Sequence, residues 1–184
     1  ISGQRLLLRN IQMEDLPHFL AYRQLPEVCR YQGFNPFTQQ QAMDFIQVHR
    51  KAQLGQVGEW MQIGIELKAK AQLIGDCGLR FQKAAPKIID LGYTIHPTFQ
   101  QRGLATEALR LLLSEVFQKY EVHKANALID PRNIGSIKLV EKLGFQREAH
   151  FRQSYFDELD QAWTDEYQYG LLANEFLSIT RSEA

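Results

Sequence analysis

The chain has 184 residues, 45% of them hydrophobic, and its 21 lysines and arginines balance 21 aspartates and glutamates. This length suffices for one hydrophobic core, so we expect a single domain over residues 1–184. The zero formal net charge excludes a general attraction to nucleic acid or to an acidic membrane surface, so any charged site has to be local.

The first third of the chain is predicted to form one strand and two helices. Residues 5–10 read as a short strand, and the apolar spacing over 11–25 predicts a helix that Pro26 ends. Thr38 and Gln41 form a capping box that opens a second helix. Its apolar positions are Ala42, Phe45, Ile46, Val48 and Leu54, and Gly55 and Gly58 are expected to close it.

The rest of the chain predicts a sheet with helices between its strands. Residues 59–67, 73–81 and 88–95 have the pattern of an antiparallel meander. A helix of about 17 residues with one apolar stripe follows, then a strand at 123–130 and a shorter helix that ends at Gly144. Residues 145–156 and 161–172 form the arms of a closing hairpin. The order β α α β β β α β α β β predicts an α+β fold with a mixed sheet.

The loop before the long helix is the strongest candidate binding site. The first amides of a helix have no partner inside it, and the helix dipole adds roughly half a positive charge, so phosphate can bind there. Gly103 permits close backbone approach, Ala105 leaves room beside the loop, and Arg102 can add a charged contact. A plain strand-to-helix turn explains the glycine equally well, because a short glycine pattern is a weak signal.

Several motifs in order give this loop a family context. Gln100-Gln101-Arg102-Gly103-Leu104-Ala105 resembles the Gln/Arg-x-x-Gly-x-Gly/Ala motif of the GCN5-related N-acetyltransferases (GNAT), which holds the pyrophosphate of coenzyme A. Around it, the chain is similar to the branch that acetylates ribosomal-protein N-termini at Ser or Ala, in the segments RLLLR, LIGDCGL, DLGYTIHP, GLATEAL, NIGSIKLVEKLGF and DEYQYGLL. The resemblance spans nearly the whole chain.

This resemblance implies a GNAT fold with six to seven strands, about four helices and a splayed V between the fourth and fifth strands. It implies acetyl-CoA as co-substrate, bound in the V. Alternation in 88–95 places Asp90 and Gly92 on one face, where a glycine lets a ligand approach closely, although a bulge would also explain it. The cofactor contacts that the resemblance implies are Leu91, Gly92, Tyr93, Thr94, Gln100, Gln101, Arg102, Gly103, Leu104, Ala105, Thr106 and Asn133.

Acetyl transfer to an amine needs a neutral amine and a proton donor for the leaving thiolate. Asp90 stands where the branch commonly has a glutamate, which suggests a base on the acceptor side; an electrostatic or structural role is the alternative. Val140 stands where many members have a tyrosine, which excludes a tyrosine acid there. The resemblance leaves Ser136 as proton donor near the thioester sulfur and Asn133 as a ligand of pantetheine or water, while both residue types also cap helices.

The remaining reactive side chains favour structural roles. Cys77 has no histidine at motif distance, His96 ends a strand, and Glu107 complements a helix dipole. Cys29 and Cys77 are too few for a disulfide framework and lack metal-site spacing, so we expect no metal and a reducing, cytoplasmic location. The sequence lacks a secretion signal or an apolar run near the roughly 20 residues that cross a bilayer, so no membrane association is expected.

The acceptor is expected to bind between residues 26–37 and the tip of the closing hairpin. Acidic residues gather at that tip: Asp157, Glu158, Asp160 and Asp165. Apolar walls would come from Tyr31, Phe34, Phe37 and Trp163. Such a mouth would attract a cationic amine, although acidic residues are also ordinary in a solvated turn. The first hypothesis is a protein N-terminal Ser or Ala amine; the alternatives are a polyamine, amino sugar or antibiotic, and a non-catalytic acyl-CoA-binding module. A homodimer is left open.

Overall fold

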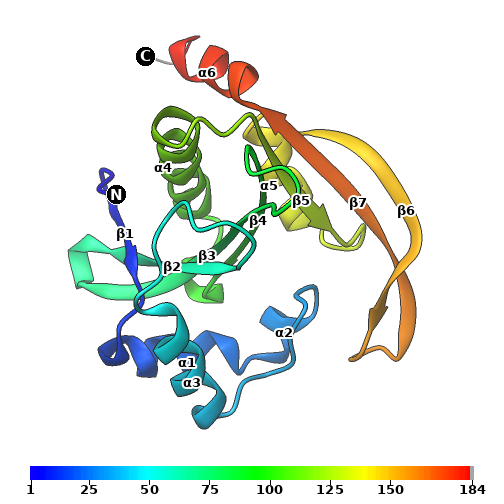
Figure 1. Cartoon of the computed structure of the whole chain (residues 1–184). Helices are drawn as coiled ribbons and strands as arrows, with labels where there is room; N and C mark the ends of the chain where they lie inside the picture. Colours follow the sequence, from blue (N-terminus) through cyan, green and yellow to red (C-terminus); the bar gives the residue numbers. More distant parts are fainter. Residues whose placement is uncertain (183–184) are drawn as a thin grey trace.

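The computed structural model describes residues 1–182, which are built around one seven-stranded sheet with the strand order β1-β2-β3-β4-β5-β7-β6 (Figure 1). The strands are β1 (Leu6–Asn10), β2 (Met61–Leu67), β3 (Gln72–Phe81), β4 (Ile88–Ile95), β5 (Lys124–Ile129), β6 (Gln146–Asp157) and β7 (Ala162–Leu172). The helices are α1 (Leu16–Arg23), α2 (Pro26–Cys29), α3 (Gln39–His49), α4 (Leu104–Lys119), α5 (Ile134–Lys142) and α6 (Ala173–Ser182). The predicted α+β class and mixed sheet are confirmed.

The junction of β4 and β5 is the parallel part of the sheet. The two strands pair at Ile88–Lys124, Ile89–Ala125 and Asp90–Asn126, and after the third pair they separate. The neighbouring pairs β3–β4 and β5–β7 are antiparallel and continue on either side. The separation leaves the backbone of β4 beyond Asp90 without a paired strand on its β5 side, which forms the predicted V.

Helices cover the two faces of the sheet unequally. Apolar residues of β3 and β4 such as Leu79 and Leu91 pack with α4, α5 and α6 in the main core, which also includes Leu109. On the other face, α1 and α3 build a smaller core around Phe19 and Ile46. In Figure 1, α1, α2 and α3 lie together beside one part of the sheet, whereas the β6–β7 hairpin lies at the other edge with its tip toward α2. The part of this face between the helices and the hairpin is where the cleft described below opens.

The second predicted helix begins as expected but ends early. Thr38 and Gln41 form the expected capping box. The helix ends at His49 instead of Gly55, because the side chain of Asn10 donates to the carbonyls of Arg50 and Ala52 at 3.1 and 3.0 Å. These bonds satisfy carbonyls that a helix end leaves free. The prediction that Val48 lies on the buried side is also wrong, since it is 72% exposed.

Two helices were not predicted from the sequence. The first helix does stop before Pro26, but Pro26 then opens the short α2, consistent with the preference of proline for a first helical turn. The second, α6, follows β7 directly and packs Phe176 against Phe117 at a ring separation of 5.4 Å. The described residues therefore contain six helices instead of about four.

Candidate active site

The loop before α4 has the backbone conformation of an anion site. Gln101 and Gly103 adopt left-handed φ angles of 58° and 71°, and the helix begins at Leu104. Such turns direct successive N–H groups to one side, where they add to the free amides of the first helical turn. Gln100 serves the loop itself, since its side chain donates to the carbonyl of Ile95 at 3.0 Å. The loop thus fits a pyrophosphate through its backbone.

Arg5 fixes the first turn of α4 from the N-terminal side. Its backbone N–H and its Nε donate to the two carboxylate oxygens of Glu107 at 2.8 and 2.6 Å, and its Nη1 donates to the carbonyl of Arg102 at 3.0 Å. The pKa of Glu107 is lowered: burial acts to raise it, but the hydrogen bonds and charge of Arg5 outweigh that effect. Glu107 is therefore an anchor of the loop, as well as the dipole partner expected from the sequence.

A side-chain contact links β4, one arm of the V, to α5, the helix that follows β5. The hydroxyl of Tyr93 on β4 donates to the carbonyl of Ser136 on α5 at 3.3 Å. Burial raises the pKa of Tyr93 to about 12, so the hydroxyl keeps its proton at neutral pH. Gly92, the neighbouring residue, has no atom within 4 Å of the position that a Cβ would occupy. A larger side chain would therefore fit at position 92 without a clash, so packing within the fold does not explain the glycine.

Asn133 and Ser136 meet at the start of α5. The side-chain oxygen of Asn133 accepts a hydrogen bond from the backbone N–H of Ser136 at 3.1 Å, so Asn133 is the N-cap of the helix. Ser136 is half-buried, and its carbonyl receives the Tyr93 hydroxyl. The capping role expected for Asn133 is present, and the roles toward a ligand that the sequence suggested for both residues stay predictions.

A cleft of about 490 Å³ opens on the face of the sheet that carries Asp90 and Gly92. Its floor is formed by alternate residues of neighbouring strands, and its walls are the loop after α2 and the β6–β7 hairpin. The residues that line it are Arg30, Tyr31, Gln32, Gly33, Trp60, Arg80, Gln82, Asp90, Leu91, Gly92, Asn126, Leu128, Asp130, Tyr155, Asp157, Thr164, Glu166 and Gln168. The V and the cleft therefore meet at Asp90, Gly92 and Asn126.

Asp90 is held in the floor by two side chains of β3 and the turn that follows it. Arg80 donates to one carboxylate oxygen through Nε at 3.1 Å and Nη2 at 2.7 Å, and Gln82 donates to the other at 2.7 Å. The Arg80 guanidinium in turn lies 5.1 Å from the ring centre of Trp60. The carboxylate is thus oriented from one side and retains lone pairs toward the cleft.

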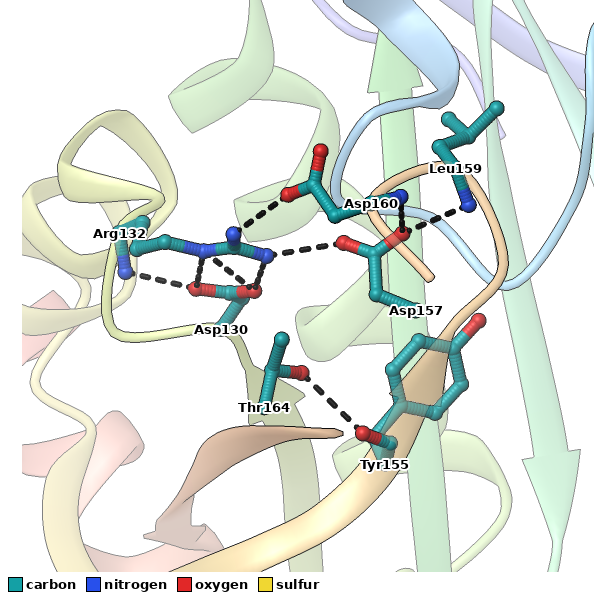
Figure 2. A network of polar contacts seen from close by, with 7 residues as sticks. All are labelled: Asp130, Arg132, Tyr155, Asp157, Leu159, Asp160 and Thr164. Atoms are coloured by element: carbon teal, nitrogen blue, oxygen red, sulfur yellow. Dashed lines mark hydrogen bonds and ion pairs between the residues drawn. The ribbon is translucent and has the colours of Figure 1, made fainter. Parts of the chain in front are cut away.

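Arg132 ties the hairpin to the end of β5 (Figure 2). Its guanidinium donates to Asp130 and Asp157 through Nη2 at 2.7 and 2.9 Å, and to Asp160 through Nη1 at 2.7 Å. The pKa of Asp157 is lowered: burial opposes the shift, but hydrogen bonds from the Asp160 backbone and from Arg132 outweigh it. The same guanidinium lies 5.6 Å from the ring centre of Tyr31 on the facing loop.

The loop after α2 packs on a buried ion pair between α1 and β3. Arg23 and Asp76 are 4% and 1% exposed and meet at 2.5 Å, and the hydroxyl of Tyr22 donates to the same carboxylate. The guanidinium also lies 4.2 Å from the ring centre of Phe34. Higher in the loop, Gln32 donates to the carbonyl of Tyr93 on the free edge of β4 at 3.3 Å.

The acidic and aromatic residues expected at the acceptor mouth are brought together only in part: Phe34, Asp157 and Glu158 line a pocket of about 270 Å³ between the loop after α2 and the hairpin tip. Of the four acids, Asp157 lines the cleft, whereas Glu158 accepts from Asn35. Asp160 pairs with Arg132, and Asp165 with His150. Of the four aromatic residues, Tyr31 lines the cleft; Phe34 and Phe37 surround Arg23, and Trp163 packs on Phe156 with 60% of its surface exposed.

Sequence reasoning missed several polar residues of the site, among them Arg80, Asn126 and Glu166 in the cleft and Arg132, which holds the hairpin beside it. A signal existed for two of them. In β5, Ala125, Ala127 and Ile129 are buried, so Asn126 belongs to the opposite, polar face. The same alternation in β7 places Glu166 beside Thr164 and Gln168. Arg80 and Arg132 required knowledge of which carboxylates the fold brings near them.

The reactive residues set aside from the sequence do not join this site. Cys77 is fully buried, and burial raises the pKa of its thiol, followed in effect by Asp76. His96 accepts from the backbone N–H of Thr98 at 3.2 Å. Within residues 1–182, no group of three or more His, Cys, Asp or Glu is placed to hold a metal ion. No helix in that part of the chain has the length and apolarity to cross a membrane.

The family is decided by comparison with known proteins. The family described as "Acetyltransferase (GNAT) domain" matches residues 5–146, which include the α4 loop, both arms of the V and the start of α5. The chain belongs to the GNAT acetyltransferase family. As a GNAT acetyltransferase it is an acyltransferase that uses acetyl-CoA as donor and an amine as acceptor.

Relatives cover almost the whole of this GNAT chain. An uncharacterized N-acetyltransferase, p20, of Bacillus licheniformis is 30% identical over 174 residues, which is 94% of this chain and 96% of the relative. Two solved structures from Vibrio cholerae share the fold. A spermidine N-acetyltransferase in complex with CoA and spermine has a TM-score of 0.80 at 19% identity, covering 95% of this chain and 99% of that one. A protein assigned as a ribosomal-protein-serine acetyltransferase has a TM-score of 0.75 at 24% identity, covering 94% and 96%.

Proposed function

We propose that this GNAT enzyme acetylates a primary amine that enters through the sheet-face cleft and meets the donor at the base of the V. One observation carries the proposal: the last paired residues of the parallel ladder, Asp90 and Asn126, are also in the floor of the cleft. A thioester donor lying along β4 would therefore end where the cleft begins. The open space at Gly92 supports this placement.

Binding of acetyl-CoA would rest on the α4 loop and the free edge of β4. The left-handed Gln101 and Gly103 and the first amides of α4 would bind the pyrophosphate, with Arg102 adding charge. Leu91 to Thr94 and Asn133 would contact the pantetheine arm, and Leu104 to Thr106 complete the loop. The bound donor supplies an activated acetyl thioester; the chain has to position the amine and handle its protons.

Asp90 and Ser136 are the proposed proton-handling residues. Arg80 and Gln82 orient the Asp90 carboxylate, whose remaining lone pairs would accept the proton from the amine directly or through water. Ser136, near the start of the helix that follows the opposite arm of the V, would give a proton to the departing thiolate. The Tyr93 hydroxyl, bound to the carbonyl of Ser136, would hold that residue in place.

The finer proposal for the acceptor is the N-terminal amine of a protein that begins with Ser or Ala. An α-amine with a pKa of about 8 is roughly one-tenth neutral at pH 7, whereas a lysine-type amine near 10.4 is less than about a thousandth neutral. The Asp90 carboxylate already accepts hydrogen bonds from Arg80 and Gln82, which leaves it fewer free lone pairs to take up a proton. It therefore suits the α-amine, which needs less assistance to lose its proton. The solved structure assigned to a ribosomal-protein-serine acetyltransferase is consistent with this class.

A second candidate is a small polycationic amine. The specific observation in its favour is that four acids, Asp90, Asp130, Asp157 and Glu166, line the cleft against two arginines, Arg30 and Arg80. The similar fold of a spermidine N-acetyltransferase adds support.

Release of free thiol from acetyl-CoA tests both candidates. The purified chain is mixed with peptides that start with Ser or Ala and, separately, with polyamines and aminoglycosides. Turnover of the peptides supports the first candidate, and turnover confined to one small amine would replace it with the second. If none of the acceptors in the panel increased the release of thiol, the proposed amine transfer would be refuted. A cytoplasmic location and a homodimer stay predictions, for which cell fractionation and sedimentation are the measurements.

A further inference from the structure

We propose that Glu166 binds a second positive charge on the acceptor, so that the preferred acceptor carries a cation some distance from the amine that is acetylated. This inference rests on the proposed function, because it assigns a role in acceptor binding to the far end of the same cleft. The shared chemistry is a primary amine linked to a remote cation. A basic side chain near a peptide N-terminus and the distal ammonium of a diamine both supply it.

Glu166 is the acid of the cleft that the protein leaves without a cation. It is half-buried on β7, and its carboxylate accepts one hydrogen bond, from the hydroxyl of Ser154 at 2.9 Å. Among the side chains that the structure describes, residues 1–179, no Lys, Arg or His pairs with this carboxylate within 4.0 Å. A half-buried carboxylate with free lone pairs is a strong acceptor for an ammonium group.

The other acids that line the cleft are already compensated. Asp90 pairs with Arg80 at 2.7 Å, and Asp130 and Asp157 both pair with Arg132. At each of these three positions a guanidinium already offsets the negative charge that an incoming cation would meet. At Glu166 the hydrogen-bond partner is the neutral hydroxyl of Ser154, so its negative charge is not offset in this way.

The neighbourhood of Glu166 favours positive charge independently of that contact. Tyr155, which pairs with Thr164 on the same strand as Glu166, lines the same cleft. The pKa of the Tyr155 hydroxyl is raised, first by burial and then by repulsion from Asp157, Glu158 and Glu166. The negative potential that disfavours a phenolate there also favours an ammonium group.

The sheet sets the separation between the two ends of the acceptor. Asn126, at the base of the V, pairs with Gly170 on β7. Glu166 lies four residues earlier on the same strand, and with about 3.3 Å per residue its backbone is roughly 13 Å from that pair. Glu166 and Gln168 lie on the same face of the strand, so the path between the ends runs along the cleft floor. A linear acceptor of that length, and not a compact amine, matches this geometry.

The test compares acceptors that differ only in the second charge. One pair is the linear eight-carbon terminal diamine and the eight-carbon monoamine; the other is a Ser-Lys peptide and its Ser-norleucine counterpart. Steady-state kinetics are measured for the wild type and for Glu166→Gln and Glu166→Asp. Glu115→Gln, on the far part of α4, removes the same charge outside the cleft and is the control.

The wild type is expected to prefer the dicationic member of at least one pair by about 10-fold or more in kcat/KM, through a lower KM. Glu166→Gln should abolish that preference and leave the KM for acetyl-CoA unchanged. Glu166→Asp should retain part of it, and Glu115→Gln all of it. An equal loss for charged and uncharged acceptors, or no preference in the wild type, would overturn the inference while amine transfer stands.

Calorimetric titration of the same diamine and peptides onto the CoA-bound protein separates this inference from the reaction. Binding that weakens about 10-fold in Glu166→Gln supports the cation site even if no acetyl transfer is detected. Binding that the substitution does not change, or no binding to the wild type, contradicts it. The peptide and diamine arms identify which source of the second charge the cleft accepts.

Discussion

Replacing Asp76 by Asn tests whether the buried ion pair supports the acceptor loop. The substitution keeps the side-chain shape but leaves the Arg23 guanidinium, 4% exposed, without an opposing charge. Removing one partner of a buried pair costs about 3–5 kcal/mol. The Phe34 ring at 4.2 Å and a remaining amide hydrogen bond offset part of that cost, so we expect a loss of about 3 kcal/mol in the free energy of unfolding.

Urea denaturation followed by circular dichroism measures this loss. For a chain of this size, about 3 kcal/mol corresponds to roughly 6–12 °C in Tm. Lys119→Gln, which breaks the exposed pair with Glu115, is the control and should cost no more than about 0.5 kcal/mol. A loss below about 1 kcal/mol for Asp76→Asn would refute the reasoning, because the aromatic surroundings alone would then hold the charge.

The same variant has a functional readout. Phe34 and Gln32 belong to the loop that borders the cleft, and Gln32 contacts the edge of β4. If Arg23 positions this loop, Asp76→Asn raises the KM for the amine acceptor several-fold at a temperature where the protein is fully folded. The KM for acetyl-CoA should not change. An equal rise in both would point to a general loss of structure.

Three further changes test the site. Gly92→Val places a side chain in open space, so the free energy of unfolding should not fall. Acetyl-CoA turnover should drop more than about 10-fold, because the new side chain would occupy the space proposed for the donor along β4. Unchanged kinetics would contradict that placement of the donor. Gly103→Val forces a left-handed φ on a branched residue, costing about 1–2 kcal/mol and raising the KM for acetyl-CoA; an unchanged KM argues against the loop. The pKa of Asp157 is lowered by folding, so its contribution is complete above the ordinary carboxyl value of about 3.9 and is lost as the pH falls below it. Trp163 fluorescence in a Trp60→Phe background should report release of the hairpin in that acidic range, and a response unaffected by Arg132→Gln would exclude the clamp.

Local patterns were sufficient for the donor side of the site. The turn at Gln101 and Gly103, the strand with Gly92 and the cap at Asn133 are each encoded within a few consecutive residues, so their elements could be predicted with small errors at the ends. The end of α3 was predicted wrongly because its cap comes from Asn10, about 40 positions away in the chain.

The acceptor side depends on contacts that sequence spacing does not report. The acidic hairpin looked like a uniformly negative mouth, but Arg132 neutralises part of it from another element. The uncompensated acid, Glu166, was one polar residue among several in an alternating strand. Pairing between charged side chains requires the strand order, in which β5 lies between β4 and β7. In that order the last strand, β7, lies between β5 and β6, and no local sequence pattern specifies this position.

The parallel junction of β4 and β5 also has a mechanical meaning. It joins two antiparallel sections, β1 to β4 and β5 to β6, through only three residue pairs. A ligand that lies in the V touches both sections and adds contacts where the backbone ladder has stopped. Binding to the folded state alone raises its stability by mass action. Bound coenzyme should therefore strengthen the junction between β4 and β5, so that the protein with coenzyme resists shear between the two sections better than the protein without it.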